Sequence, residues 1–320
     1  NEAYDKRDFK LTIEKYELLI ERFPETSWSR VATYNLGLAL ERSGQFERAI
    51  PQFVATYKWR RRTKDAQDAL FRIAACQEAL QRWVQLRKST DKLLRPEYPA
   101  ISPVERLEAE TLNGLAHQHI GDLAVAERRY KSALKLFKRH IANRALAQSR
   151  YVSMAQYQVG EIYRELFEGI RFKLPVERME RDLEEKSNLF LKAQNAYLKT
   201  VRFQHREYAV NAGFRLGNIY EVMYEHLLSA EVPSNLNEED VEVYYEELNR
   251  QLKPLISKAI NIFERNLKLA ERMGKQGEWM RRTDDSLTRL KTILEELSVK
   301  DAMSKLKEQT SRGKPSEDAP

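Results

Sequence analysis

The residue types that most often carry chemistry in proteins are few in this chain and are scattered along it. The sequence has one cysteine, Cys76, and five histidines, His117, His119, His140, His205 and His226. Only His117 and His119 are close together, and two residues apart on a helix they point in different directions, so a shared metal ion is not expected. One cysteine cannot form a disulfide within the chain. Because Cys76 lies in an apolar helical stretch, we predict a buried and inert thiol.

Catalytic motifs are absent as well. The sequence holds no glycine-rich phosphate loop, no HExxH, no GxSxG and no paired-cysteine motif. Its many aspartates and glutamates follow the pattern of solvated helix faces. We therefore expect no catalytic residue, no cofactor and no metal, so that the chemistry left to this protein is that of a binding surface.

The composition indicates which elements present that surface. The chain has 320 residues, of which 42% are hydrophobic and 32% charged, and a mean hydropathy of -0.66. No stretch approaches the ~18 consecutive apolar residues of a membrane-spanning helix, so no transmembrane segment is predicted in this chain. Only 11 glycines and 10 prolines are present, and good helix formers dominate. This composition predicts an all-α fold of helices joined by short turns.

A four-residue pattern recurs along the chain: an aromatic, a polar, an aliphatic and a small residue. It is found as YNLG (34–37), FRIA (71–74), YQVG (157–160) and FRLG (214–217), and TLNG (111–114) lacks only the aromatic. A turn and a second amphipathic stretch follow in SGQFERAIPQF (43–53) and IGDLAVAERRY (120–130). Because recurring supersecondary units pack against one another in repeat proteins, the predicted unit is a helical hairpin.

These units resemble the tetratricopeptide repeat (TPR) family, which pairs a helix carrying a Leu-Gly step with a helix carrying Ala, an aromatic and Ala. The matching residues are Leu36, Gly37, Gly44, Phe46, Ala49 and Phe53 in one unit, and Gly114, Gly121, Asp122, Ala126, Tyr130, Ala133 and Leu136 in another. The position that the family usually fills with Trp holds Thr33, Leu70, Glu110, Gln156 and Gly213. The resemblance covers residues 1–270 and implies a right-handed α-solenoid.

We expect one solenoid domain over residues 1–298, starting inside a repeat and built of about five to six hairpins. Growing spacing between the repeats predicts helical insertions near 167–187 and 231–253, before second helices at 189–201 and 254–270. Asn237 is the expected N-cap of an amphipathic helix in the later insertion. A capping helix is expected near 278–298, and the polar residues 299–320 are predicted to be disordered.

The family resemblance also implies a concave groove lined by the first helix of each hairpin. Its expected anchors are the rings of Tyr34, Phe71, Tyr157 and Phe214. Polar and aliphatic neighbours on that face are Asn35, Leu38, Glu41, Arg72, Gln158, Glu161, Arg215 and Asn218. Such a surface suits a partner peptide or helix. The alternative is that these rings pack between adjacent repeats.

Charge is unevenly distributed along the chain. Residues 58–95 hold 11 Lys or Arg against 4 acids, and residues 231–250 hold 7 acids against one Arg. The densest basic cluster comprises Lys58, Arg60, Arg61, Arg62 and Lys64. Such a patch favours an acidic protein partner, whereas the alternative is a solvated helix face. Nucleic acid is a less favoured partner, because no nucleic-acid-binding motif accompanies the charge.

The leading functional hypothesis is a non-enzymatic scaffold for protein–protein interaction. Residues 16–37 resemble repeats of Gram-negative cell-envelope proteins of the outer-membrane assembly, division and gliding-motility kind, which favours a periplasmic or envelope-associated protein over a cytoplasmic one. The alternative is a regulatory or sensor module of a larger enzyme or transcription regulator. A stand-alone enzyme ranks third. The sequence predicts no oligomeric state and names no partner.

Overall fold

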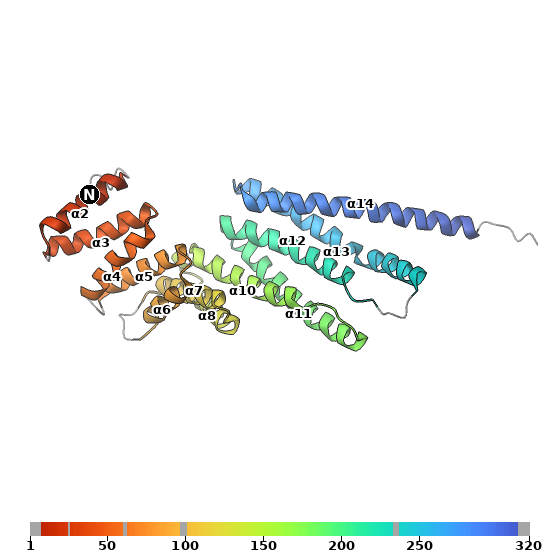
Figure 1. Cartoon of the computed structure of the whole chain (residues 1–320), viewed down its shortest axis with the longest axis horizontal. Helices are drawn as coiled ribbons and strands as arrows, with labels where there is room; N and C mark the ends of the chain where they lie inside the picture. The colour runs from red at the N-terminus through yellow and green to blue at the C-terminus, as the bar shows by residue number, and fades with distance from the viewer. Residues whose placement is uncertain (1–7, 25, 60–62, 97–100, 233–236, 313–320) are drawn as a thin grey trace, which may run out of the picture. The chain divides into compact units, whose positions relative to one another are not determined.

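The computed structural model describes residues 8–24, 26–59, 63–96, 101–232 and 237–312 (Figure 1). These residues form helices and short connections and contain no strand, which confirms the predicted all-α class. The chain divides into two compact units, Asn1–Gln158 and Val159–Pro320, where the sequence predicted one domain. We call them the N-terminal and the C-terminal unit.

The N-terminal unit is a series of antiparallel helices, in which each helix from α2 to α7 contacts the next and the short α9 contacts α7. The helices are α2 (Phe9–Arg22), α3 (Ser27–Arg42), α4 (Phe46–Trp59), α5 (Lys64–Ala79), α6 (Trp83–Leu93), α7 (Pro103–His119), α8 (Leu123–Arg139) and the short α9 (Arg144–Ala147). Contacts link α3 to α4, α5 to α6 and α7 to α8 as hairpins, and α4 to α5 and α6 to α7 as neighbours. Stacked hairpins of this kind make a TPR-like helical repeat fold.

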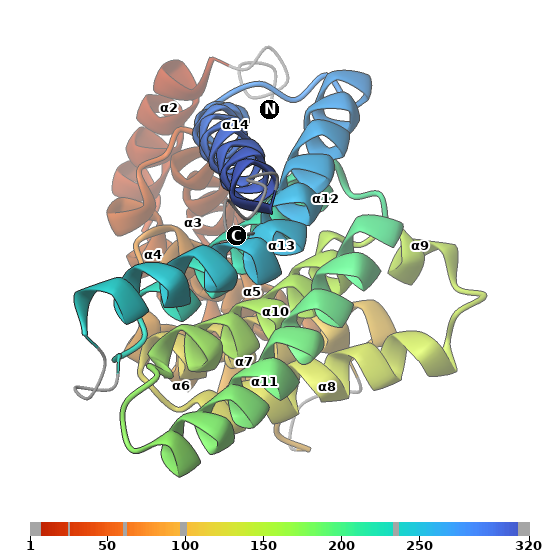
Figure 2. The same cartoon turned by 90° about the vertical axis from the view of Figure 1, so that its right-hand side faces the viewer.

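The C-terminal unit is built from longer helices. They are α10 (Arg150–Gly169), which begins in the N-terminal unit, α11 (Val176–Arg202), α12 (Arg206–Leu228), α13 (Glu238–Arg272) and α14 (Glu278–Arg312). The helices α12 and α13 pack along each other as a hairpin (Figure 2), and α14 packs on α13.

One contact recurs in four hairpins and explains the repeated small residue. A glycine of the first helix faces an aromatic ring of the second so closely that an added Cβ would lie 2.4 to 2.7 Å from that ring. The pairs are Gly37 with Phe53, Gly114 with Tyr130, Gly160 with Tyr197 and Gly217 with Phe263. All four rings are fully buried. The glycine therefore sets how closely the two helices approach, as the sequence pattern predicted.

The small residues on either side of these rings are buried too. Ala126 and Ala133 flank Tyr130, and none of the three is exposed to solvent. The turns before the second helices contain Gly44 and Gly121, whose φ angles of +77° and +87° lie in the region that favours glycine. In the hairpin of α5 and α6 the recurring pair is replaced by Ala74 and Thr90.

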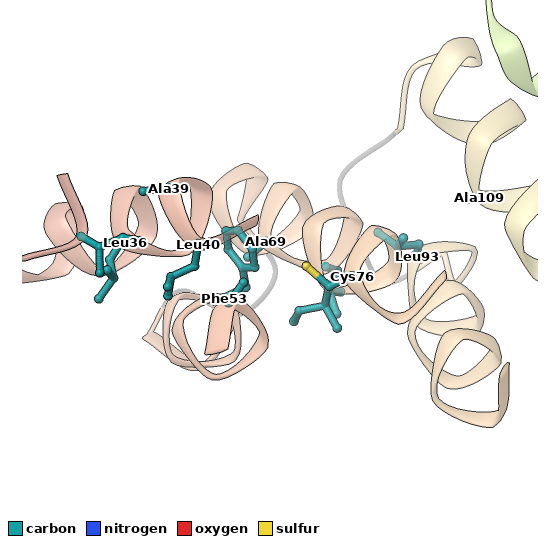
Figure 3. Close-up of a cluster of buried hydrophobic side chains, with 12 residues drawn as sticks. Leu36, Ala39, Leu40, Phe53, Ala69, Cys76, Leu93 and Ala109 are labelled. Carbon is teal, nitrogen blue, oxygen red and sulfur yellow. The ribbon is translucent and has the colours of Figure 1, made fainter. Parts of the chain in front are cut away.

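A buried cluster of the N-terminal unit extends from α2 to α7, with most of its members on α3, α4 and α5. Figure 3 shows Leu40, Phe53 and Ala69 gathered between these helices, with Cys76 further along the same cluster. The Cys76 thiol is fully buried, as predicted. Burial, and then the nearby Glu41 carboxylate, raise the pKa of Cys76 to about 12. Because the reactive form is the thiolate, this cysteine is a core residue.

The position of the missing Trp is buried in all five of these units and is filled by residues smaller than Trp, most of them small or polar. Its occupants are Thr33, Leu70, Glu110, Gln156 and Gly213. The Glu110 carboxylate is held by Arg129 at 3.2 Å and by the hydroxyl of Ser132 at 3.3 Å. At Gly213 the space is taken by Asn266, whose Oδ1 would lie 1.9 Å from an added Cβ. Local partners thus compensate for the absent indole.

The predicted insertions are mostly helical, as expected, but they are continuous with neighbouring helices, which corrects the expected helix boundaries. Where a second helix was expected only at 189–201, after an insertion at 167–187, α10 continues to Gly169 and α11 already begins at Val176. In the second case α13 is a single helix of 35 residues that runs through Pro254, where a separate helix was expected to start. Pro254 is exposed, so that its missing N–H and its ring are tolerated on the solvent side. The added residues therefore lengthen both helices of a hairpin.

Asn237 caps α13 as the sequence predicted. Its Oδ1 accepts a hydrogen bond of 2.9 Å from the backbone N–H of Asp240, and the Asp240 carboxylate accepts one from the N–H of Asn237. Because this reciprocal cap satisfies two N–H groups of the first turn, Asn237→Ala should lower the free energy of unfolding by about 1 kcal/mol. Urea titration followed by circular dichroism measures the change. A loss below about 0.3 kcal/mol would contradict a stabilising cap.

The C-terminal end of the described chain differs from expectation. The helix α14 continues to Arg312, although residues 299–320 were predicted to be disordered. Residues 299–312 are mostly helix formers, and no glycine or proline interrupts them before Gly313. Near the start, Ile13 is buried, and the half-buried Tyr16 and Ile20 pack on the core. Residues 1–7 and 313–320 lie outside the described residues.

Candidate interaction surfaces

The four predicted anchor rings divide into two pairs. Tyr34 and Phe71, both in the N-terminal unit, are half-buried, and Phe71 packs on the core beside α3. Tyr157 is only 7% exposed and Phe214 only 4%. Phe214 packs between Phe263 and Trp279, at ring-centroid distances of 5.8 and 5.3 Å. The predicted set is thus corrected: Tyr157 and Phe214 belong to the interior, and Tyr34 and Phe71 remain reachable.

Tyr34 lines a hollow of about 390 Å³ in the N-terminal unit, which we call the Tyr34 hollow. Its walls come from three helices and comprise Ser27, Arg30, Val31, Tyr34, Thr56, Trp59, Asp65 and Asp68. The Tyr34 ring stands edge-on to buried Phe53 at a centroid distance of 5.7 Å, which fixes its orientation. Val31 is 59% exposed and Trp59 is 44% exposed. The hollow therefore presents large apolar side chains to solvent.

Charged groups of α3 and α5 line the Tyr34 hollow. The Arg30 guanidinium lies 5.8 Å from the centre of the Trp59 ring, a cation–π arrangement. On the α5 side are Asp65 and Asp68, and Asp68 forms an ion pair of 3.1 Å with Lys64. An apolar floor with guanidinium and carboxylate rims offers both an anchor site and orienting polar groups.

The polar residues of the predicted groove are mostly engaged within the protein. Glu41 pairs with Arg72 at 3.2 Å between α3 and α5. In the C-terminal unit the Glu161 carboxylate pairs with Arg215 at 3.1 Å and accepts a hydrogen bond of 2.6 Å from the Tyr197 hydroxyl. The remaining residues are half-buried: Asn35, Leu38, Gln158 and Asn218. These groups thus stabilise the packing of neighbouring helices within each unit.

The predicted basic cluster is described only in part. Lys58 is exposed at the end of α4, and Lys64 forms ion pairs with Asp68 and Glu105. Arg60, Arg61 and Arg62 lie outside the described residues. The proposed attraction of an acidic partner to this cluster therefore stays a prediction.

The histidines take local structural positions. His119 stacks on Trp83 with ring centroids 3.8 Å apart and an interplanar angle of 4°. His117 faces Asp122 at 3.4 Å. Among the described residues, no three His, Cys, Asp or Glu side chains come together in a way that could hold a metal ion.

His226 takes part in an arrangement that sequence reasoning missed. Lys186 of α11 is fully buried, and its Nζ lies 2.6 Å from Nδ1 of His226 on α12. The same ammonium donates to the backbone carbonyls of Phe167 and Ile170, at 2.6 and 2.9 Å. It also lies 4.0 Å from the centre of the Phe167 ring. Three N–H donors thus meet three acceptors at the carboxyl end of α10.

The environment of this cluster disfavours positive charge. Burial, and then the nearby Arg171, lower the pKa of Lys186 to about 8, against an opposing effect of Glu168. Burial, followed by Lys186 and Arg171, lowers the pKa of His226 to about 4. At neutral pH the imidazole is therefore neutral and accepts at Nδ1, while the amine remains mostly protonated. The cluster holds the connection between α10 and α11 against α12.

No helix among the described residues combines the length and hydrophobicity needed to cross a bilayer. Neither a known protein family nor a curated protein matches the sequence. Solved structures do resemble the fold. A tetratricopeptide repeat protein from Parabacteroides merdae is 13% identical, with 88% of this chain and 94% of that chain covered at a TM-score of 0.40. BtubC from P. vanneervenii is 15% identical, with 86% and 96% covered at a TM-score of 0.37. At these identities the likeness is one of fold alone.

Proposed function

We propose that this helical repeat protein is a non-enzymatic interaction module whose Tyr34 hollow binds an apolar side chain of a partner segment. The observation that carries the proposal is the exposure of Val31 and Trp59 around a ring that the core holds in place. Apolar groups gathered at a concave, rigid site are typical of places where binding energy concentrates.

The pairing of the surrounding polar groups supports a preformed site. Because Glu41 and Arg72 already bind each other, α3 and α5 are fixed relative to one another before any partner arrives. A preformed surface loses less conformational entropy on binding than a flexible one. The partner is expected to be a peptide segment or helix with one apolar anchor. On the sequence resemblance alone, we place this interaction in a bacterial envelope complex.

Affinity capture tests the proposal. The purified chain is used as bait in extracts of its source cells, and captured proteins are quantified by mass spectrometry. The variant Val31→Glu/Trp59→Ala should reduce capture of at least one abundant partner by about tenfold or more, because two exposed anchors are lost. Both side chains are partly exposed, so that the fold should persist.

Trp28→Ala is the matched control. Trp28 is on α3 and is 76% exposed, but it does not line the hollow. Capture by this control should equal that of the wild-type protein. Equal losses in both variants, or no protein that distinguishes Val31→Glu/Trp59→Ala from wild type, would reject the Tyr34 hollow as the binding site.

A further inference from the structure

A second concave surface lies in the C-terminal unit, between α11 and α13, with α12 beneath it. The helix α12 contacts both of them (Figure 1). The groove has a volume of about 510 Å³. Its apolar walls include Leu198 and Val201 of α11 and Ile262 and Leu269 of α13, and Leu198 is 41% exposed. We call this surface the α11–α13 groove.

One rim of the groove is strongly cationic. Lys258, Arg265 and Arg272 follow one another at intervals of seven residues on α13, which places them in one row along the helix. All three are exposed. An adjoining hollow of about 680 Å³ shares Lys258 and Arg265 and adds Arg250. No aspartate or glutamate is found among the described residues that line either hollow.

The positive charge of this rim is largely uncompensated. Within the part of the chain that the structure describes, neither Lys258 nor Arg265 forms an ion pair. Glu264, the neighbour of Arg265 in the sequence, forms its ion pair with Lys291 of α14 and not with a cation of the rim. Uncompensated cations beside an apolar trough form a surface that attracts a ligand of opposite charge.

The spacing of the lining residues indicates the shape of that ligand. Along α13 the cations alternate with Ile262 and Leu269 at intervals of four and three residues, which is the spacing of a helix-packing seam. On α11, Leu198 and Val201 are three residues apart and form a second apolar row that lines the same groove. Two helices that present facing rows across a groove can receive a third helix between them.

We propose that the α11–α13 groove binds an acidic amphipathic helix of a partner protein, whose apolar stripe enters the groove and whose carboxylates face Lys258, Arg265 and Arg272. A nucleic-acid backbone would place phosphates against the apolar walls, and a flat membrane surface does not enter a groove. The acidic helix is the one ligand that satisfies both the walls and the rim.

A designed peptide provides the probe. It is a fluorescein-labelled helix of about 15 residues, near the length at which isolated helices become stable. Leucines repeat at intervals of four and three, and glutamates occupy the flanking positions. A peptide with the same composition but scrambled leucines, and one with lysines in place of the glutamates, are the controls. Fluorescence anisotropy at low salt and near 0.15 M salt should show binding of the first peptide only, and weaker binding at the higher salt.

Matched charge reversals test the location. The triple variant Lys258→Glu/Arg265→Glu/Arg272→Glu should weaken binding of the acidic peptide about 100-fold, since attraction becomes repulsion along the whole rim. The control Lys268→Glu/Arg281→Glu/Lys300→Glu changes the net charge equally on exposed positions outside the groove and should bind within about threefold of wild type. Leu198→Asp tests the apolar wall by a change at a single exposed residue.

Three outcomes would overturn the proposal. One is that the groove and control triple variants weaken peptide binding equally, which would show that net charge alone causes the effect. Another is that duplex DNA or anionic vesicles bind more tightly than the peptide and that the groove triple variant abolishes this binding. The third is self-association of the wild-type chain that Leu198→Asp abolishes, because a second copy would then fill the groove. Val31→Glu/Trp59→Ala should bind the peptide normally, so that the two proposals fail independently.

Discussion

Lys186→Met should lower the free energy of unfolding by about 2 to 4 kcal/mol at pH 7, one of the largest effects expected of a single substitution here. Met has a similar length and fills the buried volume, but it donates no hydrogen bond. The carbonyl of Ile170 and Nδ1 of His226 would lose the ammonium as a donor, and the carbonyl of Phe167 would keep only the 3.4 Å hydrogen bond from the Ile170 N–H. Urea denaturation followed by circular dichroism measures the loss.

Two opposing terms set the size of this effect. Each acceptor left without a partner costs about 1 to 3 kcal/mol. Against this, removing the ammonium relieves its desolvation, which is substantial because burial lowers the pKa of Lys186 from 10.5 to about 8. That shift corresponds to about 3 kcal/mol. The three weakened or lost hydrogen bonds together exceed this gain over most of that range, so the net change is a loss of stability.

The same residue should give wild-type stability a characteristic pH dependence. The folded pKa of Lys186 lies below its unfolded value, so between about pH 8 and 10.5 the unfolded chain holds a proton that the folded chain has released. The free energy of unfolding contributed by Lys186 therefore rises with pH through this window and is constant below it. His226 has a folded pKa of about 4, below its unfolded value of 6.5. The free energy of unfolding that it contributes is therefore lost as the pH falls from 6.5 to 4.

Lys199→Met is the matched control, because Lys199 is exposed on the same helix. It should change stability by less than about 0.5 kcal/mol. In Lys186→Met the alkaline rise relative to this control should disappear. If Lys186→Met were as stable as the control and kept the alkaline rise, the ammonium would not be the group that holds the end of α10.

The repeat register was predictable because it depends on local spacing. In YNLG and FRLG, the small residue after an aliphatic one indicates where a second helix must come close, and Gly37 and Gly217 do face Phe53 and Phe263. The N-cap Asn237 was predictable for the same reason, since a cap is formed within one turn. Interactions over short sequence distances can be inferred from residue types alone.

Helix ends were harder to predict, since tertiary packing extends helices beyond their local signals. Pro254 suggested a helix start, yet packing of α13 along α12 keeps the helix continuous through it. Polar composition suggested disorder after residue 298, yet helix-forming residues carry α14 on to Arg312. Local composition and a proline therefore determine the helix ends less strongly than packing against neighbouring helices does.

The candidate sites required three-dimensional contacts. Lys186 belongs to a stretch predicted to be an insertion, and its partner His226 follows 40 residues later, so no local pattern joins them. The aromatic pattern could not separate Tyr34 from Phe214, because both occupy the same repeat position. The difference arises from α14, whose Trp279 covers Phe214. Which repeat position is exposed depends on what packs next to it.

Gly217→Leu should lower the free energy of unfolding by about 3 kcal/mol or more, because it forces side-chain atoms into a filled space. A Cβ at this position already lies 2.4 Å from the Phe263 ring, which is fully buried and packs on Phe214 at a centroid distance of 5.8 Å. The ring has no solvent-side space to move into. Thermal and urea unfolding followed by circular dichroism measure the loss, with an expected decrease in Tm of several degrees.

A pair of alanine substitutions separates crowding from the general effect of replacing glycine in a helix. Gly169→Ala, at the end of α10, places its Cβ where no atom lies within 4 Å, so it should leave stability unchanged or raise it by about 0.5 to 1 kcal/mol. Gly217→Ala should instead lower it. Adding Phe263→Ala to Gly217→Leu should recover part of the loss, because the two side chains then share one space. Strict additivity of these two changes would show that α12 and α13 do not meet through this contact.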